Sequence, residues 1–179
     1  MTQQIESELM QKVKQGDSKS FELLVRILES PLMKYFYYMT GSKEDSEDLF
    51  QDAWIKVYEM RKKYEEGKEA RSWIFIIARN ICLNFLKRKR TLKQKINEIH
   101  QPVSQTQETP ESSVLQADYK KAIQESLLLL PLEQREAMIL RFWEQKSYSQ
   151  IADIMQTSIG NVGYWISRAV ETLRIKCPK

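Results

Sequence analysis

The stretch at residues 147–173, SYSQIADIMQTSIGNVGYWISRAVETL, decides the fold, because it predicts two short helices joined by a tight turn. Ser147 can cap the first helix, and Gln150 three residues later completes a capping box. Ser158 can cap the second helix, whose apolar residues recur at helical spacing. On another face of that helix lie an amide, two aromatic rings and a guanidinium: Asn161, Tyr164, Trp165 and Arg168. This layout is typical of a helix-turn-helix that reads DNA, although a plain helical hairpin within a bundle has the same periodicity.

The composition favours helices throughout the chain. Of 179 residues, 42% are hydrophobic, while only five are glycine and five are proline. The length allows one large domain or two small ones. The formal net charge of +4 is modest, but residues 71–97 contain eight lysines and arginines and no acid. We expect an all-α protein with one strongly basic segment.

Several functional classes are excluded by the residues that the chain lacks. Cys82 and Cys177 lie far apart without metal-ligand spacing, so free thiols in a reducing compartment are expected. His100 is the single histidine, which excludes a histidine metal cluster and a Ser-His triad. No Gly-rich phosphate loop or nucleophile–base pair is visible, so we expect no catalytic residue, metal or cofactor. The polar N-terminus and the short apolar runs predict a cytoplasmic protein without a signal peptide or membrane insertion.

The N-terminal part predicts three scaffold helices followed by a longer, two-sided one. The first helix ends near Gly16, and the second begins at Ser18 or Ser20. Pro31 suits the first turn of a third helix. Residues 42–64 then form a long helix whose apolar stripe is accompanied by a polar, acidic line of Asp48, Gln51, Asp52 and Glu59, with Ile55 among them. This line is either an ordinary solvated face or a docking face for a basic or polar partner.

A charged loop at residues 64–70 precedes a helix over residues 71–90 that ends in a purely basic run. Cations at a helix C-terminus complement the helix dipole, so part of this run has a structural explanation. Four consecutive cations exceed what capping needs, and an acid-free surface beside exposed aromatic rings suits a phosphate backbone and unstacked bases. The segment therefore predicts a surface that binds nucleic acid.

The chain divides into two small helical domains. From about Thr91 the helical pattern fails, and residues 101–113, QPVSQTQETPESS, are polar and have little to bury. Such a segment is typical of a flexible linker. Two further helices precede the helix-turn-helix, one ending at Pro131 and one over residues 133–143. We predict an N-terminal domain over residues 1–92, a linker over 93–117 and a C-terminal domain over 118–179.

Three segments in a fixed order carry a family resemblance. They are EDLFQDAWIKVYE at residues 47–59, SWIFIIARNICLNFLKRKR at 72–90 and LPLEQREAMILRFWEQKSYSQIADIMQTSIGNVGYWISRA at 130–169. With a polar linker between the second and third, the chain resembles the extracytoplasmic-function (ECF) group of RNA polymerase sigma factors, in the sigma-70 family. The resemblance implies a factor that binds core RNA polymerase and directs initiation at specific promoters. The alternative is a stand-alone helix-turn-helix transcriptional regulator, which would bind duplex DNA tightly without polymerase.

The resemblance implies three sets of contacts. The helix over residues 42–64 would dock on the clamp helices of the polymerase's largest subunit through Asp48, Leu49, Gln51, Asp52 and Ile55. The loop at 64–70 and the helix after it would hold the non-template strand of the minus-ten element through Tyr64, Lys68, Arg71, Trp73, Arg79, Asn80, Lys87 and Arg88. The second helix of the helix-turn-helix would enter the major groove of the minus-thirty-five element with Ser158, Asn161, Tyr164, Trp165 and Arg168.

The remaining partners follow from the resemblance alone. The polymerase flap would be a further contact, and an anti-sigma protein would silence the factor. One departure concerns the recognition helix, because relatives carry a Lys-Ser-Arg-like stretch where this chain has Gly163, Tyr164 and Trp165. A glycine inside a helix costs roughly 1 kcal/mol relative to alanine, and two expected cations are missing. The reading of the upstream element is therefore expected to differ from that of the relatives.

Overall fold

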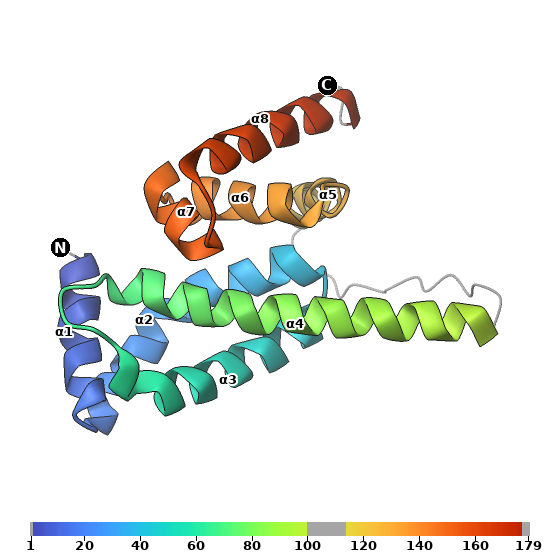
Figure 1. The fold of residues 1–179 in the computed structure, drawn as a ribbon. Coiled ribbons are helices and arrows are strands. Elements are labelled where there is room, and N and C mark those ends of the chain that lie inside the picture. The colour runs from blue at the N-terminus through green and yellow to red at the C-terminus, as the bar shows by residue number, and fades with distance from the viewer. Residues whose placement is uncertain (1, 100–113, 177–179) are drawn as a thin grey trace.

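A computed structural model describes residues 2–99 and 114–176, with side chains from 4 to 94 and from 121 to 175. Within these ranges the chain forms eight α-helices and one short 3-10 helix, and no strand (Figure 1). The elements are α1 (Thr2–Lys14), α2 (Ser18–Thr40), α3 (Lys43–Met60), η1 (Arg61–Lys63), α4 (Ala70–Ile99), α5 (Val114–Leu128), α6 (Leu132–Phe142), α7 (Tyr148–Met155) and α8 (Ile159–Lys176). The all-α expectation is confirmed. No helix in this described part is long and apolar enough to cross a membrane.

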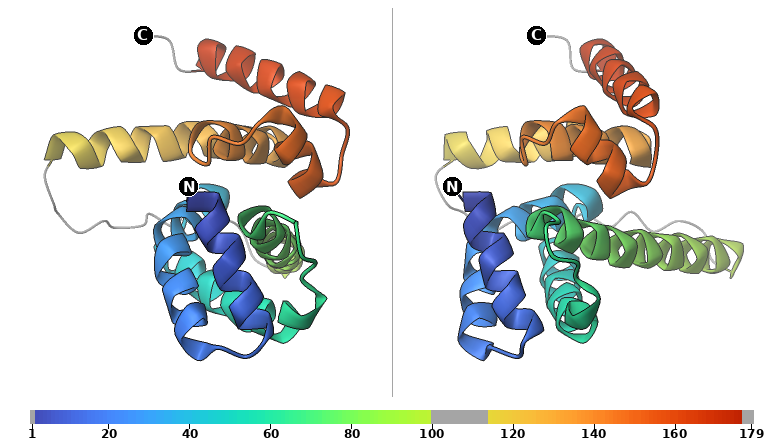
Figure 2. Two further views of the ribbon diagram at one scale, coloured as in Figure 1. Left: turned by 90° about the vertical axis from the view of Figure 1, so that its left-hand side faces the viewer. Right: turned by 60° about the vertical axis from the view of Figure 1, so that its left-hand side comes forward.

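The helices form two bodies that lie against each other. Helices α1 to α4 form the N-terminal domain, and α5 to α8 lie over it on the side of α2 and α4 (Figures 1 and 2). Helix α8 forms the layer farthest from the N-terminal domain, and the C-terminal end of α4 projects beyond the bundle (Figure 1). The two expected domains are present, and they are docked on each other.

The prediction that a third helix begins near Pro31 is wrong. Residues 18–40 form one continuous helix, α2, with this proline inside it. A proline within a helix costs about 3 kcal/mol, since it removes a backbone donor and crowds the preceding turn. Packing outweighs this cost, because buried side chains continue at helical spacing on both sides of the proline: Leu24, Leu28, Leu32, Tyr35, Phe36 and Met39. The helix ends at Gly41, whose φ of 78° is the left-handed conformation that favours glycine.

The segment between α4 and α5 is shorter than the linker that the sequence predicted. Residues 93–99 continue α4, and residues 114–117 already belong to α5. The segment TLKQKINEI at 91–99 contains no glycine or proline and is rich in helix formers, so α4 continues without needing a buried face. The rest of the predicted linker lies outside the described residues, as do His100 and Cys177.

The apolar repeats of α1, α6 and α7 predict that Ile5, Phe142 and Tyr148 face inward, but all three lie at the surface. Glu6, next to Ile5, is instead fully buried. A buried charge is normally paired with an opposite charge. Glu6 has such a partner in Arg71 of α4.

Candidate nucleic-acid interface

Hydrogen bonds of Ser147 and Ser158 cap the two helices of the helix-turn-helix, α7 and α8, as the sequence predicted. The Ser147 backbone N–H donates to Gln150 Oε1 at 2.9 Å, and the Gln150 N–H donates to Ser147 Oγ at 3.2 Å. Helix α7 ends where Gln156 adopts φ 53°, the left-handed conformation that reverses the chain. Ser158 Oγ then accepts from the Asn161 N–H at 3.1 Å and opens α8.

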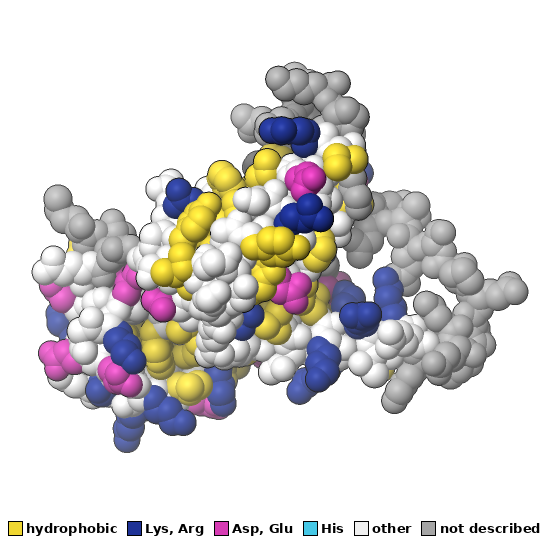
Figure 3. All heavy atoms as spheres, turned by 45° about the horizontal axis from the view of Figure 1, so that its top comes forward, with side chains coloured by type: hydrophobic (Ala, Val, Ile, Leu, Met, Phe, Trp, Pro, Cys, Tyr) yellow, Lys and Arg dark blue, Asp and Glu magenta, His cyan; other side chains and the backbone are white. Residues whose placement is uncertain are grey.

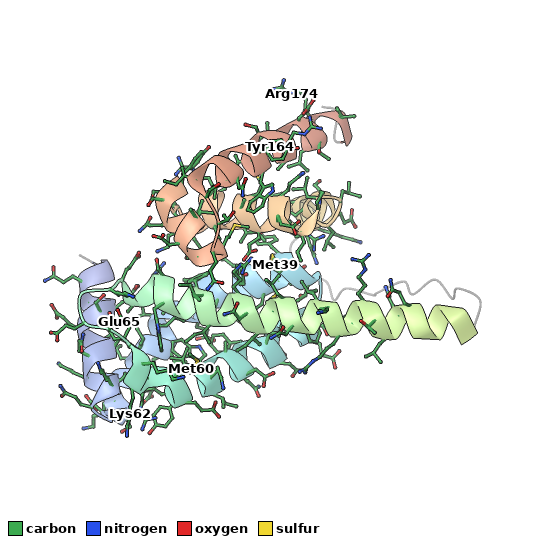
Figure 4. All side chains as sticks on the ribbon, in the orientation of Figure 1. Met39, Met60, Lys62, Glu65, Tyr164 and Arg174 are labelled. Atoms are coloured by element: carbon green, nitrogen blue, oxygen red, sulfur yellow. The ribbon has the colours of Figure 1, made fainter. Side chains whose placement is uncertain are left out.

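The outward face of α8 carries Tyr164 at its centre. Tyr164 is 60% exposed, and Figure 4 shows it on α8, in the layer away from Met39 of α2. Asn161 and Arg168 are also exposed, and each has a local partner: Asn161 Nδ2 donates to Thr157 Oγ1 at 2.9 Å, and Arg168 pairs with Glu171 at 2.6 Å. These three side chains are exposed on α8, as the sequence predicted.

Trp165 does not share the face of Tyr164. Its side chain is half-buried and packs against the hydrophobic core of the domain. The reason is geometric, because Trp165 lies three residues after Val162 and four residues before Ala169, both buried, and residues at this spacing share one side of a helix. This corrects the grouping of Trp165 with the outward residues, and it makes Tyr164 the exposed aromatic residue of the recognition helix.

The face of the C-terminal domain turned away from the N-terminal domain is more apolar than basic. Figure 3 shows hydrophobic side chains spread over this face, with basic groups scattered between them. The exposed large apolar residues of the C-terminal domain include Phe142, Ile159, Tyr164 and Val170. Positions 163–165 of α8 carry no cation, and Arg168, one helical turn after Tyr164, is the exposed basic side chain nearest to it in the sequence of this helix.

The polar line expected on α3 is exposed along the helix. Asp48, Gln51 and Asp52 lie at the surface, and Ile55 is 60% exposed beside them. Leu49 points the other way, because it is only 2% exposed and belongs to the core with Ala53. The structure therefore offers four of the five expected docking residues on one surface, and the fifth holds the helix in place.

The loop between η1 and α4 is organised around a buried tyrosine. Tyr64 is 1% exposed, its ring meets the Trp73 ring edge-on at 5.5 Å, and its hydroxyl donates to the Lys68 carbonyl. Lys14 Nζ of α1 donates to the Tyr64 carbonyl at 2.7 Å. In this arrangement the Tyr64 ring is not free to stack on a base, contrary to its expected role, and it shapes the loop from within. Lys68 is exposed and pairs with Glu65.

Arg71, at the start of α4, is held by acids from both domains. Its Nη2 lies 2.6 Å from Glu6 Oε1 of α1, and its Nη1 lies 3.3 Å from Glu144 Oε2, which follows α6. Burial lowers the pKa of Arg71, but the hydrogen bonds and charge of Glu6 outweigh it, so the pKa is raised above its ordinary value. The guanidinium expected to bind the melted strand is occupied.

Arg79, two turns further along α4, also pairs with the C-terminal domain. Its Nε lies 2.9 Å from Glu136 Oε1, and Glu136 accepts a hydrogen bond from the Tyr35 hydroxyl at 2.9 Å. Burial raises the pKa of Glu136, and the nearby Arg79 charge only partly opposes this. Burial, followed by the Glu136 charge, raises the pKa of Tyr35 as well. Glu136, Arg79 and Tyr35 form a buried polar cluster between the domains.

The remaining expected residues of α4 lie at the surface or near it. Trp73 is half-buried, whereas Asn80, Lys87 and Arg88 are exposed. Lys87 and Arg88 belong to the part of α4 that leads into the projecting end (Figure 1). This end presents positive charge to solvent without an acid of its own helix nearby, as expected for a surface that binds phosphate.

The sequence did not predict that three charged residues of the C-terminal domain pair with α4 and the loop before it: Glu136, Glu144 and Lys146. A signal was present for Glu136, because it lies in phase with the buried Ile139 and Leu140 of α6. A charge within an apolar repeat indicates a buried partner. The identity of that partner could not be read from the sequence, since Arg79 lies on another domain.

Two family models match the chain, one in each of its two domains. The model described as Sigma-70 region 2 matches residues 24–91, and the model described as Sigma-70, region 4 matches residues 120–173. The ECF RNA polymerase sigma factor SigW of Bacillus subtilis is 25% identical over 92% of each chain. The ECF RNA polymerase sigma-E factor of Escherichia coli is 27% identical, over 92% of this chain and 90% of its own.

Two solved structures share the fold over most of both chains. CnrH, in complex with the cytosolic domain of CnrY, has a TM-score of 0.73 at 17% identity and covers 96% of each chain. The sigma factor RpoE of Bartonella quintana, in complex with the anti-sigma factor NepR, has a TM-score of 0.68 at 24% identity. It covers 90% of this chain and 99% of its own.

The chain therefore belongs to the sigma-70 family of transcription initiation factors. Within that family it is an ECF sigma factor, since relatives that are named ECF RNA polymerase sigma factors align with it over most of both chains. The alternative of a stand-alone regulator is not supported, because the relatives that match nearly the whole chain are RNA polymerase sigma factors. Sigma factors select promoters and are not themselves the catalysts of transcription.

Proposed function

We propose that the chain binds core RNA polymerase in the cytoplasm and directs it to a specific set of promoters, with no catalytic residue, metal or cofactor of its own. The observation that carries the proposal is the presence of both family regions, each as a helical body with its own exposed surface. One body offers an acidic docking face and a basic strand-binding helix. The other offers a helix-turn-helix.

The exposed face of α3 would hold the polymerase. Asp48 and Asp52 supply negative charge, Gln51 supplies a hydrogen-bonding amide, and Ile55 supplies apolar area at the same surface. An apolar residue surrounded by polar groups is the usual composition of a specific protein interface. The partner would be the clamp helices of the largest subunit, and the flap would receive the C-terminal domain.

The minus-ten element would be bound along α4 and the loop before it. Lys68, Asn80, Lys87 and Arg88 are already exposed, and Trp73 lies half-buried at the base of the loop. Arg71 and Arg79 can join them once they leave their acidic partners. Unstacking bases costs a few kcal/mol per step, and contacts to phosphates and aromatic rings would offset that cost.

The minus-thirty-five element would be read by the N-terminal half of α8. Ser158 can reach a phosphate, Asn161 can form the paired hydrogen bonds that recognise adenine, and Tyr164 can pack on a thymine methyl group. Arg168 supplies the remaining cation. A recognition helix of this composition depends more on shape and apolar contact than on arginine–guanine pairs.

An anti-sigma factor is the further partner that we propose. It is suggested by the two similar structures, since RpoE was solved with the anti-sigma factor NepR and CnrH with the cytosolic domain of CnrY. The exposed apolar side chains of the C-terminal domain, such as Phe142 and Ile159, provide area that such a protein could cover.

Run-off transcription tests the proposed function. Purified core polymerase is incubated with fragments of genomic DNA, including the region upstream of the factor's own operon, with and without the protein. We expect new transcripts with discrete start sites only when the protein is present. Unchanged transcription on every fragment, with a core enzyme active on other sigma factors, would remove the proposal.

A further inference from the structure

The last turns of α4 that have described side chains are exposed on every side. Residues 87–94, KRKRTLKQ, include five lysines and arginines and no acid, and all eight are exposed. Eight residues make more than two helical turns, so no side of this part of the helix is buried in the core. Its charges therefore do not follow from packing, and they need another explanation.

The basic residues of α4 with described side chains divide into two groups by their partners. Three of them form ion pairs with acids of the fold: Arg71, Arg79 and Lys89. Four others lie near the end of the helix and have no ion pair with any residue that the structure describes: Lys87, Arg88, Arg90 and Lys93. The first two of these four are assigned above to the minus-ten strand, which leaves Arg90 and Lys93 without a role.

Arg90 and Lys93 lie on one side of the helix. Residues three apart are neighbours on a helix surface, and their positions are about 4.5 Å apart along the axis. Duplex DNA carries one negative charge for about every 1.7 Å of its axis, so both cations can meet phosphates of one backbone segment. The helix has no acid between Glu69 and Glu98, and the carboxylate of Asp45 on α3 is already paired with Lys89. Little negative charge therefore opposes such a contact.

The composition of this end of α4 favours paired DNA over a melted strand. Unpaired bases are held by stacking on aromatic rings, and residues 86–94 contain none. Trp73, the aromatic residue of α4 expected at the melted strand, is separated from Arg90 by about 25 Å along the helix axis. That length corresponds to roughly seven base pairs of DNA, at about 3.4 Å for each pair. The end of α4 is therefore expected beside DNA that remains paired.

The order of the chain indicates which paired DNA this is. Helix α4 is the last element of the N-terminal domain, and the chain continues to α5 and the C-terminal domain. The N-terminal domain is assigned above to the minus-ten element, and α8 to the minus-thirty-five element. The end of α4 projects from the bundle (Figure 1), and Figure 3 shows basic side chains along this projection. The duplex between the two elements, the spacer, is the segment that this end can reach.

We propose that the end of α4 binds the spacer duplex, with Arg90 and Lys93 on phosphates of its backbone. The contact depends on charge, so it is independent of the base sequence of the spacer. It holds the duplex immediately upstream of the melted segment, where paired and unpaired DNA meet. The inference rests on the proposed function, because it places the minus-ten strand along the first half of the same helix.

The first experiment needs neither polymerase nor a known promoter. A fluorescein-labelled duplex of random sequence is titrated with the full chain at several salt concentrations, and binding is followed by fluorescence anisotropy. Arg90→Gln, Lys93→Gln removes two charges and keeps good helix formers at both positions. The slope of log affinity against log salt should become shallower by about 1.8, and the affinity should fall at least about tenfold at about 0.1 M salt.

Two further variants make this result specific. Lys12→Gln, Lys19→Gln removes the same charge from exposed positions of α1 and α2, away from the projecting end of α4, and should leave the slope near the native value (Figure 1). Arg90→Lys, Lys93→Arg keeps both charges and should retain native binding. An unchanged slope in Arg90→Gln, Lys93→Gln would overturn the proposal, and so would an equal change in the Lys12, Lys19 variant or in the exchange variant.

The second experiment places the contact on the promoter. Core polymerase with the factor is bound to two fragments built on a start site that run-off transcription has mapped. Both carry a single-stranded minus-ten element and no minus-thirty-five element. One has about one helical turn of duplex upstream of the minus-ten element, and in the other the duplex ends at its edge. Arg90→Gln, Lys93→Gln should weaken binding to the longer fragment and leave binding to the shorter one unchanged.

The alternatives to a spacer contact give different results. Equal weakening on both fragments would mean that Arg90 and Lys93 bind the melted strand, and weaker binding to core polymerase in a pull-down would mean that they contact the enzyme. Either result would overturn the proposal. A slope change on the random duplex, in a protein that produces no start site with core polymerase, would remove the proposed function and leave the duplex-binding surface in place.

Discussion

Glu136 lies on the buried face of α6, where the repeat predicts an apolar residue. It precedes the buried Ile139 and Leu140 by three and four residues. Arg79 and the Tyr35 hydroxyl make this position tolerable for a carboxylate. Arg71 shows the same principle from the other domain, since Glu6 and Glu144 share its guanidinium. At the residue scale, paired charges determine how the surfaces expected to bind DNA are presented.

Gly163 offers a test of the recognition helix itself. A Cβ added there would meet Tyr148 Cε2 at 3.7 Å, an ordinary contact, and its φ is not in the left-handed region. We therefore expect Gly163→Ala to stabilise the domain by about 1 kcal/mol, read as a higher midpoint of thermal unfolding. Gly67→Ala is the control of opposite sign, because Gly67 has φ 84° and alanine is strained there. A destabilised Gly163→Ala protein would contradict the packing described for α7 and α8.

We expect recognition of the minus-thirty-five element to depend on Tyr164. Tyr164→Ala removes the exposed ring at the centre of the α8 surface and should weaken polymerase-bound recognition of the minus-thirty-five element by about 1 to 3 kcal/mol. Ser167→Ala, one turn along the exposed face, is the matched control. The comparison is made on promoter fragments with intact and scrambled upstream elements. Equal loss on both fragments would show that Tyr164 acts on stability and not on reading.

Cys82 reports on the interface between the domains. Burial raises the pKa of its thiol to about 12, with a smaller contribution from the Glu136 charge. A raised thiol pKa keeps the unreactive protonated form at mildly alkaline pH. In a Cys177→Ser background we expect Cys82 to resist a thiol reagent in the folded protein and to react rapidly in urea. Faster reaction in Glu136→Arg than in Glu133→Arg is expected, because α6 then leaves the neighbourhood of the thiol.

Helix α3 packs in the core with one face and exposes its other face to solvent. Leu49 and Ala53 point into the core, while Asp48 and Asp52 stay exposed one helical turn apart. The helix is anchored at its start by Ser42, whose Oγ accepts from the Asp45 N–H at 3.2 Å. The outward residues can therefore change without disturbing the fold.

The double variant Asp48→Ala, Asp52→Ala tests this face. It should weaken binding to core polymerase at least about tenfold, a loss of about 1.4 kcal/mol, because two charges of the docking surface disappear. Its thermal midpoint should stay near the native value, since both side chains are exposed. Glu22→Ala, Glu29→Ala on the exposed face of α2 is the control with the same charge change. Equal affinities of both double variants in a pull-down would remove the assignment of α3.

The elements that depend on local chemistry could be predicted from the sequence. The capping box at Ser147, the cap at Ser158 and the two-sided pattern of α3 are set by residues within a few positions of one another. Pro31 misled the prediction because tertiary packing of α2 outweighs a local preference. The end of α4 was misplaced because a helix of good formers needs no apolar stripe to continue.

At the scale of the whole molecule, the relation between the domains could not be predicted. The pairs Arg79–Glu136 and Arg71–Glu144 join residues of different domains, and neither leaves a pattern that names its partner. The sequence indicated two bodies on a flexible tether, and the structure shows them docked through charges. This docking contributes to the burial of Arg71 and Arg79, while Tyr64 is buried by contacts within the N-terminal domain.

A footprint of the protein on one promoter fragment, with and without core polymerase, tests most directly whether the factor engages promoters only as part of the polymerase. Protection is expected at two separated positions, one for α8 and one for the region around α4, only when core polymerase is present. The free native protein should leave the fragment unprotected at the same concentration. Protection of both positions by the protein alone, unchanged when polymerase is added, would contradict this dependence on polymerase.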